Sequence, residues 1–115
     1  MSFIKACRQA GATRVYVATA SPPVVCPNVY GIDMPYREEL VAYHHSAEEV
    51  AENIHADYVI YQNLSDLKQA CLEGALYGPP PSLFDCSCFD GVYVTGVLSP
   101  EYFDALEEKH RKTRQ

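Results

Sequence analysis

Residues 14–41 constrain the fold of this 115-residue chain more than any other part of its sequence. They begin with Val15–Thr19, a run of β-branched and aromatic side chains that is typical of a strand. Ser21-Pro-Pro23 ends that strand, because proline has no N–H to donate and a fixed φ. A glycine-hinged loop over 27–35 leads into a helical pattern over 37–43. The order strand, bent connector, helix predicts an α/β chain.

The rest of the sequence alternates between helical and strand patterns. We predict helices over 3–9, 47–54, 65–72 and 100–112, and further strands over 57–62 and 91–95. Two of the helix starts have specific signals. Ser46-Ala-Glu-Glu49 is a capping box, and Ser99-Pro-Glu101 places a cap, a first-turn proline and an acid in order. We also expect Ser65 to cap its helix. The pattern predicts a mainly parallel sheet with flanking helices in a single domain over 1–115.

The string Pro27-Asn-Val-Tyr-Gly-Ile-Asp-Met-Pro35, followed by Glu38-Glu-Leu40, resembles the late part of the phosphoribosyltransferase domain in the amidophosphoribosyltransferase family. The resemblance extends over segments 9–15, 48–50, 56–62, 88–96 and 102–109, and it is weakest over 74–81. It implies a partial type I phosphoribosyltransferase-like fold. It also implies a parent enzyme that begins purine synthesis by making 5-phosphoribosylamine from phosphoribosylpyrophosphate and glutamine, with Mg²⁺ on the pyrophosphate.

Two catalytic features of that family are missing from this sequence. A cysteine nucleophile opens the processed family enzyme, whereas this chain opens with Met1 and Ser2. The family's phosphoribosylpyrophosphate motif is an apolar strand, two adjacent acids and a Gly/Thr loop that binds phosphate through backbone N–H groups. The acid pairs here, Glu38-Glu39, Glu48-Glu49 and Glu107-Glu108, all fall in helical patterns. We therefore expect a fragment that starts just after the catalytic loop and is inactive alone. We assign it no catalytic, cofactor-binding or metal-binding residue; a free-standing interaction or regulatory module is the alternative.

The cysteines leave a third alternative open, a metal-binding or iron–sulfur domain that uses Cys86 and Cys88. A zinc site usually has two close ligand pairs, and only one tight pair is present here. Some members of the family hold an iron–sulfur cluster, and the resemblance puts its ligand positions at Asn28, Asp85 and Cys88. Only one of these is a cysteine, which favours the cluster-free branch of the family. The odd total of five cysteines argues against a disulfide framework.

Other candidate ligand-binding residues have simpler structural interpretations. We expect Asp33 to accept backbone N–H groups in a tight turn, and Tyr30 and Tyr36 to pack the loop onto the sheet. Tyr16 alternates with apolar neighbours, which fits either a core position or a sheet face. Asp90-Gly91 is a turn signal before the strand predicted over 91–95.

Charge and hydropathy limit the possible partners. The net charge of −6 argues against a nucleic-acid surface, which needs clustered Lys and Arg. No apolar stretch approaches the ~20 residues of a membrane span, and no signal-peptide pattern is present, so we predict no membrane partner and a cytoplasmic location. We also expect self-association, because part of a parallel sheet leaves free strand edges and an uncovered apolar face.

Overall fold

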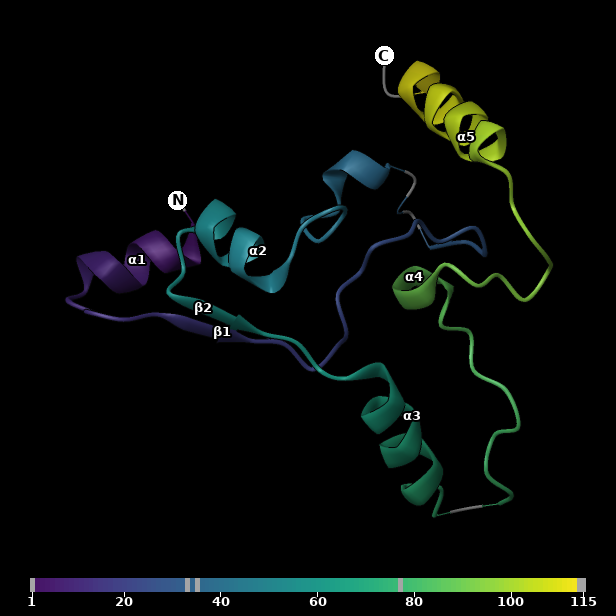
Figure 1. Ribbon diagram of the computed structural model, residues 1–115, viewed down its shortest axis with the longest axis horizontal. Helices are drawn as coiled ribbons and strands as arrows, with labels where there is room; N and C mark the ends of the chain where they lie inside the picture. The colour runs from purple at the N-terminus through teal and green to yellow at the C-terminus, as the bar shows by residue number, and fades with distance from the viewer. Residues whose placement is uncertain (1, 33, 35, 77, 114–115) are drawn as a thin grey trace. The chain divides into compact units, whose positions relative to one another are not determined.

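The computed structural model describes residues 2–32, 34, 36–76 and 78–113, and it divides into two compact units (Figure 1). The first unit contains 1–23 and 44–80, and the second contains 24–43 and 81–115. The elements in chain order are α1 (Phe3–Gln9), β1 (Tyr16–Ala18), the 3₁₀ helix η1 (Arg37–Glu39), α2 (Ala47–Ile54), β2 (Tyr58–Ile60), α3 (Leu64–Glu73), α4 (Ser87–Asp90) and α5 (Pro100–Thr113). Within the described residues, no helix is long and apolar enough to cross a membrane.

The first unit is built on a parallel pair of strands, β1 and β2. The paired residues are Tyr16 with Tyr58, Val17 with Val59, and Ala18 with Ile60. Helix α2 precedes β2 in the chain and contacts it, and Val50 of α2 and Val59 of β2 are both buried. This arrangement confirms the predicted α/β class with a parallel sheet and flanking helices.

Local capping chemistry fixes the starts of α2 and α5 as predicted. The Ser46 hydroxyl accepts a hydrogen bond from the Glu49 N–H at 3.2 Å, and the Glu49 carboxylate accepts one from the Ser46 N–H at 2.7 Å. Each side chain satisfies an N–H group that the first helical turn leaves without a partner. The Ser99 hydroxyl likewise accepts from the Tyr102 N–H at 3.3 Å, at the start of α5.

The start of α3 differs from the prediction. Its cap is Asn63, whose side-chain oxygen accepts from the N–H groups of Ser65 at 2.9 Å and Asp66 at 3.4 Å. The assignment of the cap to Ser65 is therefore wrong, because Ser65 lies inside the helix and its hydroxyl donates to the Asn63 oxygen at 2.6 Å. Asparagine and serine are both good caps, and here the asparagine two residues earlier takes the position.

The third predicted strand, over 91–95, is wrong. All five of these residues are described, and none is in a strand. Their backbone groups bond to partners other than a strand: the Val92 N–H donates to the Asp90 carboxylate at 2.9 Å, the Tyr93 carbonyl accepts from the Gly96 N–H at 3.0 Å, and the Thr95 N–H donates to the Tyr30 hydroxyl at 3.3 Å. Gly91 has a φ of 72° and ends α4, so the predicted turn at Asp90-Gly91 is present without a strand after it.

The helix predicted over 37–43 is limited to one 3₁₀ turn. Only Arg37–Glu39 is helical, since Leu40 takes extended angles (φ −80°, ψ 113°) and His44 has a φ of 57°. The Arg37 N–H donates to the Glu107 carboxylate of α5 at 3.2 Å, which satisfies an N–H group that the start of a helix leaves without an intrahelical partner. The prediction is therefore wrong beyond Glu39.

Candidate functional site

The loop that carries the family resemblance is fastened within the second unit by backbone contacts. The N–H groups of Val25 and Cys26 both donate to the Cys88 carbonyl in α4, at 2.9 and 3.1 Å. A third contact comes from the buried Tyr93, whose hydroxyl donates to the carbonyl of Pro27 at 2.7 Å. These bonds hold the first half of the loop against α4 and the segment that follows it.

Asn28 organises the second half of the loop. This buried side chain accepts from the N–H groups of Tyr30 at 2.9 Å and Ile32 at 3.0 Å through one oxygen. Its amide nitrogen lies 3.8 Å from the Cys88 sulfur. The turn acceptor expected at Asp33 lies outside the described residues, and the acceptor that the structure describes in this loop is Asn28. The signal was present in the sequence, because asparagine side chains commonly bond N–H groups two residues ahead.

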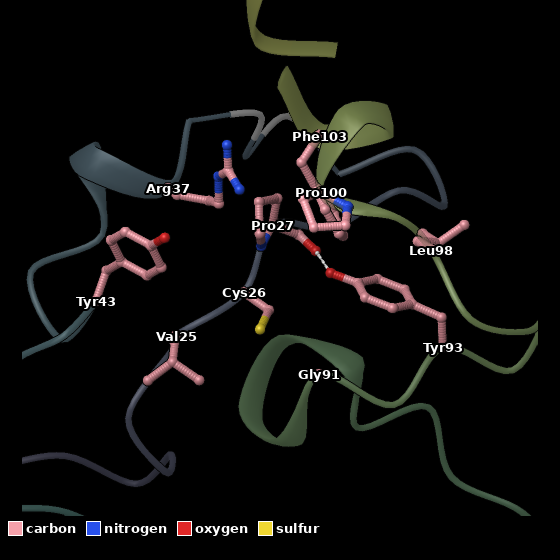
Figure 2. A pocket seen from close by; sticks show the side chains of 10 residues that line it. All are labelled: Val25, Cys26, Pro27, Arg37, Tyr43, Gly91, Tyr93, Leu98, Pro100 and Phe103. Carbon is pink, nitrogen blue, oxygen red and sulfur yellow. Dashed lines mark hydrogen bonds between the residues drawn. The ribbon is translucent and has the colours of Figure 1, made fainter. Parts of the chain in front are cut away.

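A pocket of about 250 Å³ opens beside this loop (Figure 2). Most of its lining is apolar, and the residues around it are Val25, Cys26, Pro27, Arg37, Tyr43, Gly91, Tyr93, Leu98, Pro100 and Phe103. The Arg37 guanidinium lies over the Phe103 ring, 5.6 Å from its centre, and the Tyr93 ring lies 5.6 Å from the same ring. Sequence reasoning did not find this pocket, because its walls come from segments up to 78 positions apart (25 to 103).

The one arginine in the pocket lining is already paired with carboxylates. Arg37 Nε donates to Glu107 Oε1 at 2.8 Å, and its Nη2 pairs with Asp104. The hydrogen bond that Arg37 donates to Glu107 is the main cause that holds the pKa of Arg37 above its ordinary value. Glu107 is 6% exposed, so this ion pair is largely removed from water. We therefore do not assign this guanidinium to a substrate phosphate.

Two thiols lie under the loop. Burial raises the pKa of Cys26 above its ordinary value, and Cys88 and Asp90 add to the rise. Burial also raises the pKa of Cys88, with Asp85 adding to it and the Asn28 amide opposing it. Burial therefore disfavours the thiolate form of both cysteines, and the thiolate is the form that acts as a nucleophile and metal ligand.

The three positions that the resemblance relates to an iron–sulfur cluster lie in one region of the second unit. Asn28 contacts Cys88, and Asp85 accepts from the Ser87 N–H at 3.0 Å and the Ser87 hydroxyl at 2.7 Å. Cys86 is buried, and all five cysteines are free thiols. In the part of the chain that the structure describes, no three His, Cys, Asp or Glu side chains are grouped to hold a metal ion. We therefore assign no ligands to a metal or a cluster.

The tyrosines have structural partners. Tyr30 packs against Tyr93 with ring centres 6.2 Å apart, and Tyr36 packs against His110 of α5 at 6.4 Å. Both of these ring contacts are made within the second unit. Tyr16 is on β1 with 57% of its surface exposed, which agrees with a sheet-face position and not with a core position.

The fold of the first unit is compatible with one class of protein. A parallel β1–β2 pair with α2 packed against it, in a chain that contains further helices, is compatible with part of a phosphoribosyltransferase-like fold. No protein-family model matches the chain.

Comparison with individual known proteins shows which enzymes the chain is similar to. The chain is 44% identical over 109 residues to an amidophosphoribosyltransferase of Pasteurella multocida, covering 93% of this chain and 21% of the relative. It is 45% identical over 104 residues to that of Haemophilus influenzae, covering 90% and 20%. The Escherichia coli protein of the same name is 43% identical over 105 residues, covering 91% and 20%. The chain thus corresponds to one segment of the amidophosphoribosyltransferases, which confirms the resemblance, and it spans about a fifth of the length of these relatives.

Proposed function

We propose that this chain is the C-terminal part of the phosphoribosyltransferase domain of an amidophosphoribosyltransferase, where it supports the reacting site without supplying the reacting groups. The observation that carries the proposal is the identity of 43–45% across about nine tenths of the chain to enzymes of that name. The parent reaction would be a pentosyl transfer, in which ammonia from glutamine displaces pyrophosphate from phosphoribosylpyrophosphate to give 5-phosphoribosylamine. A cytoplasmic location is part of the proposal, because the resemblance is to an enzyme of small-molecule synthesis.

The supporting role follows from how the polar groups of the second unit are used. The loop hydrogen bonds of Asn28 and Tyr93 are directed into the protein itself. Arg37 is bound to Glu107 and Asp104, and burial disfavours the thiolate form of the two cysteines beside the loop. A loop fixed in this way can hold neighbouring catalytic groups in position, a contribution that can account for several kcal/mol of a reaction barrier.

The metal of the parent reaction has no assigned site in this chain. Magnesium would serve the pyrophosphate of the substrate. In the described part of the chain, no three His, Cys, Asp or Glu side chains are grouped to hold a metal ion, and we propose no magnesium ligand here.

A chimaeric enzyme tests the proposal. The 115 residues would replace the matching segment of the Escherichia coli relative, and the chimaera would be expressed in a strain that lacks this enzyme. We expect growth without added purine, because the two segments are 43% identical over 105 residues. The control is the same enzyme with the segment deleted. A chimaera that accumulates in folded form and still gives no growth would contradict the proposal and favour a free-standing interaction module.

A second measurement addresses the chain alone. We expect no pyrophosphate release from phosphoribosylpyrophosphate above a protein-free control, with either glutamine or ammonia and excess Mg²⁺. The reason is that no phosphate-binding Gly/Thr loop after adjacent acids occurs in the sequence. Turnover above the control would mean that the 115 residues contain a reactive site.

Self-association is the part of the proposal that concerns partners. On β1 and β2, Tyr16, Tyr58 and Ile60 are 57%, 52% and 50% exposed, and each strand pairs with one neighbour among the described residues. Exposed apolar side chains on a sheet with open edges favour pairing with a second copy. Sedimentation at micromolar concentration should therefore give a mass above the 12.8 kDa of the chain, and a stable monomer would refute this part.

A further inference from the structure

Two cysteines far apart in the sequence meet at the backbone. The Cys26 N–H donates to the Cys88 carbonyl with 3.1 Å between the nitrogen and the oxygen. Standard bond lengths then place the two Cα atoms at most about 7 Å apart, and any bend at the hydrogen bond brings them closer. Disulfides join residues whose Cα atoms are about 4.4–6.8 Å apart. The two backbones are therefore at a separation that a disulfide can span.

The side chains also lie on the same side. Cys88 and Gly91 are three positions apart at the end of α4, so they share a face of that helical turn. The Cys26 sulfur lies 3.2 Å from the point where a Cβ of Gly91 would be, and its side chain is directed toward α4 in Figure 2. The absence of a side chain at Gly91 gives this sulfur room on the face that carries Cys88.

We propose that Cys26 and Cys88 form a reversible dithiol–disulfide pair that locks the 25–32 loop onto α4. The oxidant is a small-molecule disulfide such as oxidised glutathione. The thiolate of one cysteine attacks a sulfur of this disulfide, which gives a mixed disulfide and releases one small thiolate. The thiolate of the other cysteine then attacks the protein sulfur of the mixed disulfide, which forms the Cys26–Cys88 bond and releases the second small thiolate. Two electrons have passed to the oxidant, and the two protons from the cysteines end on the small thiols.

The other cysteines are poorly placed to compete for this bond. Cys86 is two positions from Cys88, a spacing at which side chains in a helical turn do not share a face, and it is 8% exposed. Cys7 and Cys71 belong to the first unit, whereas Cys26 and Cys88 belong to the second. Within the second unit, the pairing is therefore selective for Cys26 with Cys88.

Peptide mapping without reduction tests the pairing. The 115-residue chain is equilibrated in a glutathione buffer of increasing oxidised fraction, free thiols are alkylated, and the protein is digested with trypsin. Cys26 then lies in peptide 15–37, and Cys88 lies in peptide 69–109 together with Cys71 and Cys86. We expect these two peptides to be joined, with fragmentation assigning the link to Cys88 and at least about tenfold less of any other pairing, because a preformed pair has a high effective concentration.

Serine variants provide the matched comparison. Cys88→Ser should abolish the link between the two peptides, whereas Cys86→Ser should keep it. A link assigned to Cys71 or Cys86 in the unmodified chain overturns the proposal, as does a chain whose Cys26 and Cys88 carry only separate glutathione groups. The fragmentation result on the unmodified chain decides the question even where a variant does not fold.

Discussion

Replacing Tyr93 by phenylalanine should destabilise the second unit, because the hydroxyl is the donor that holds the loop. Tyr93 is 7% exposed, and its hydroxyl donates to the carbonyl of the fully buried Pro27 at 2.7 Å. The substitution keeps the ring packing against Tyr30 and Phe103 and removes only the donor. A buried acceptor that loses its partner costs about 1–3 kcal/mol in the free energy of unfolding.

Urea unfolding followed by circular dichroism measures this loss. With an m value of about 1–2 kcal/mol/M, the midpoint of Tyr93→Phe should fall by roughly 1 M, with m unchanged. The control is Tyr102→Phe on α5, whose side chain is 44% exposed. Its free energy of unfolding should change by less than about 0.5 kcal/mol, which at the same m value moves the urea midpoint much less. Equal midpoints for Tyr93→Phe and the unmodified chain would refute the argument that this hydroxyl holds the loop.

The same hydroxyl predicts an alkaline limit to stability. Burial is the main cause that raises the pKa of Tyr93, and the two nearby thiols Cys26 and Cys88 add to it. The folded state therefore retains the phenol proton to higher pH than the unfolded chain, whose tyrosines ionise near pH 10, at about the value of a free tyrosine. The stabilising contribution is complete below that pH and is lost as the pH rises further, and Tyr93→Phe should reduce this loss in urea midpoints measured above pH 10.

Three further predictions concern the ends of helices and the ion pairs. Glu107→Gln should lower the free energy of unfolding by about 1–3 kcal/mol, because it removes the charged partner of the largely buried Arg37 guanidinium. Glu108→Gln removes only an exposed ion pair with Lys112 on the same helix, so it should leave the urea midpoint nearly unchanged. Asn63→Ala should cost about 1 kcal/mol as the loss of a helix cap, and Ser65→Ala should cost clearly less; equal losses would contradict the cap assignment. A backbone N–H before β1 is the main cause that lowers the pKa of Asp57, with an arginine of α1 adding to it. Its contribution is therefore present above the unfolded value of about 4 and lost as the pH falls below it, so Asp57→Asn should lower the urea midpoint at pH 7 more than at pH 3.

Features governed by neighbours in sequence were predictable, as α2 demonstrates. Its capping box sets the start at Ala47, and the predicted end at Ile54 agrees with the structure. The helix α1 over Phe3–Gln9 was predicted for similar local reasons. The strands β1 and β2 lie where strands were predicted but are shorter, because strand length depends on the partner strand and not only on composition.

Features that need distant partners were not predictable from the sequence. Val92 and Val94 have strand composition, yet residues 92–95 follow the left-handed Gly91, and the Thr95 N–H donates to the Tyr30 hydroxyl, 65 positions away. The helix that begins at Arg37 ends at Glu39, where the chain turns to extended angles at Leu40, and Arg37 is held by Glu107, 70 positions away. The pocket and the contact between Asn28 and Cys88 join segments 60 or more positions apart, and no periodicity in the sequence reports such a contact.

The interleaved order of the two units has a consequence for synthesis of the protein. Because the chain passes from one unit to the other at 23–24, 43–44 and 80–81, neither unit is a continuous stretch. On the ribosome, the partner strands β1 and β2 emerge with the whole 24–43 segment between them, and that segment must wait for 81–115 before its own contacts can form. The Cys26–Cys88 and Arg37–Glu107 contacts therefore form only after the 81–115 segment has been synthesised. A ribosome that stalls before α4 would leave the family's most recognisable loop exposed to proteases and chaperones.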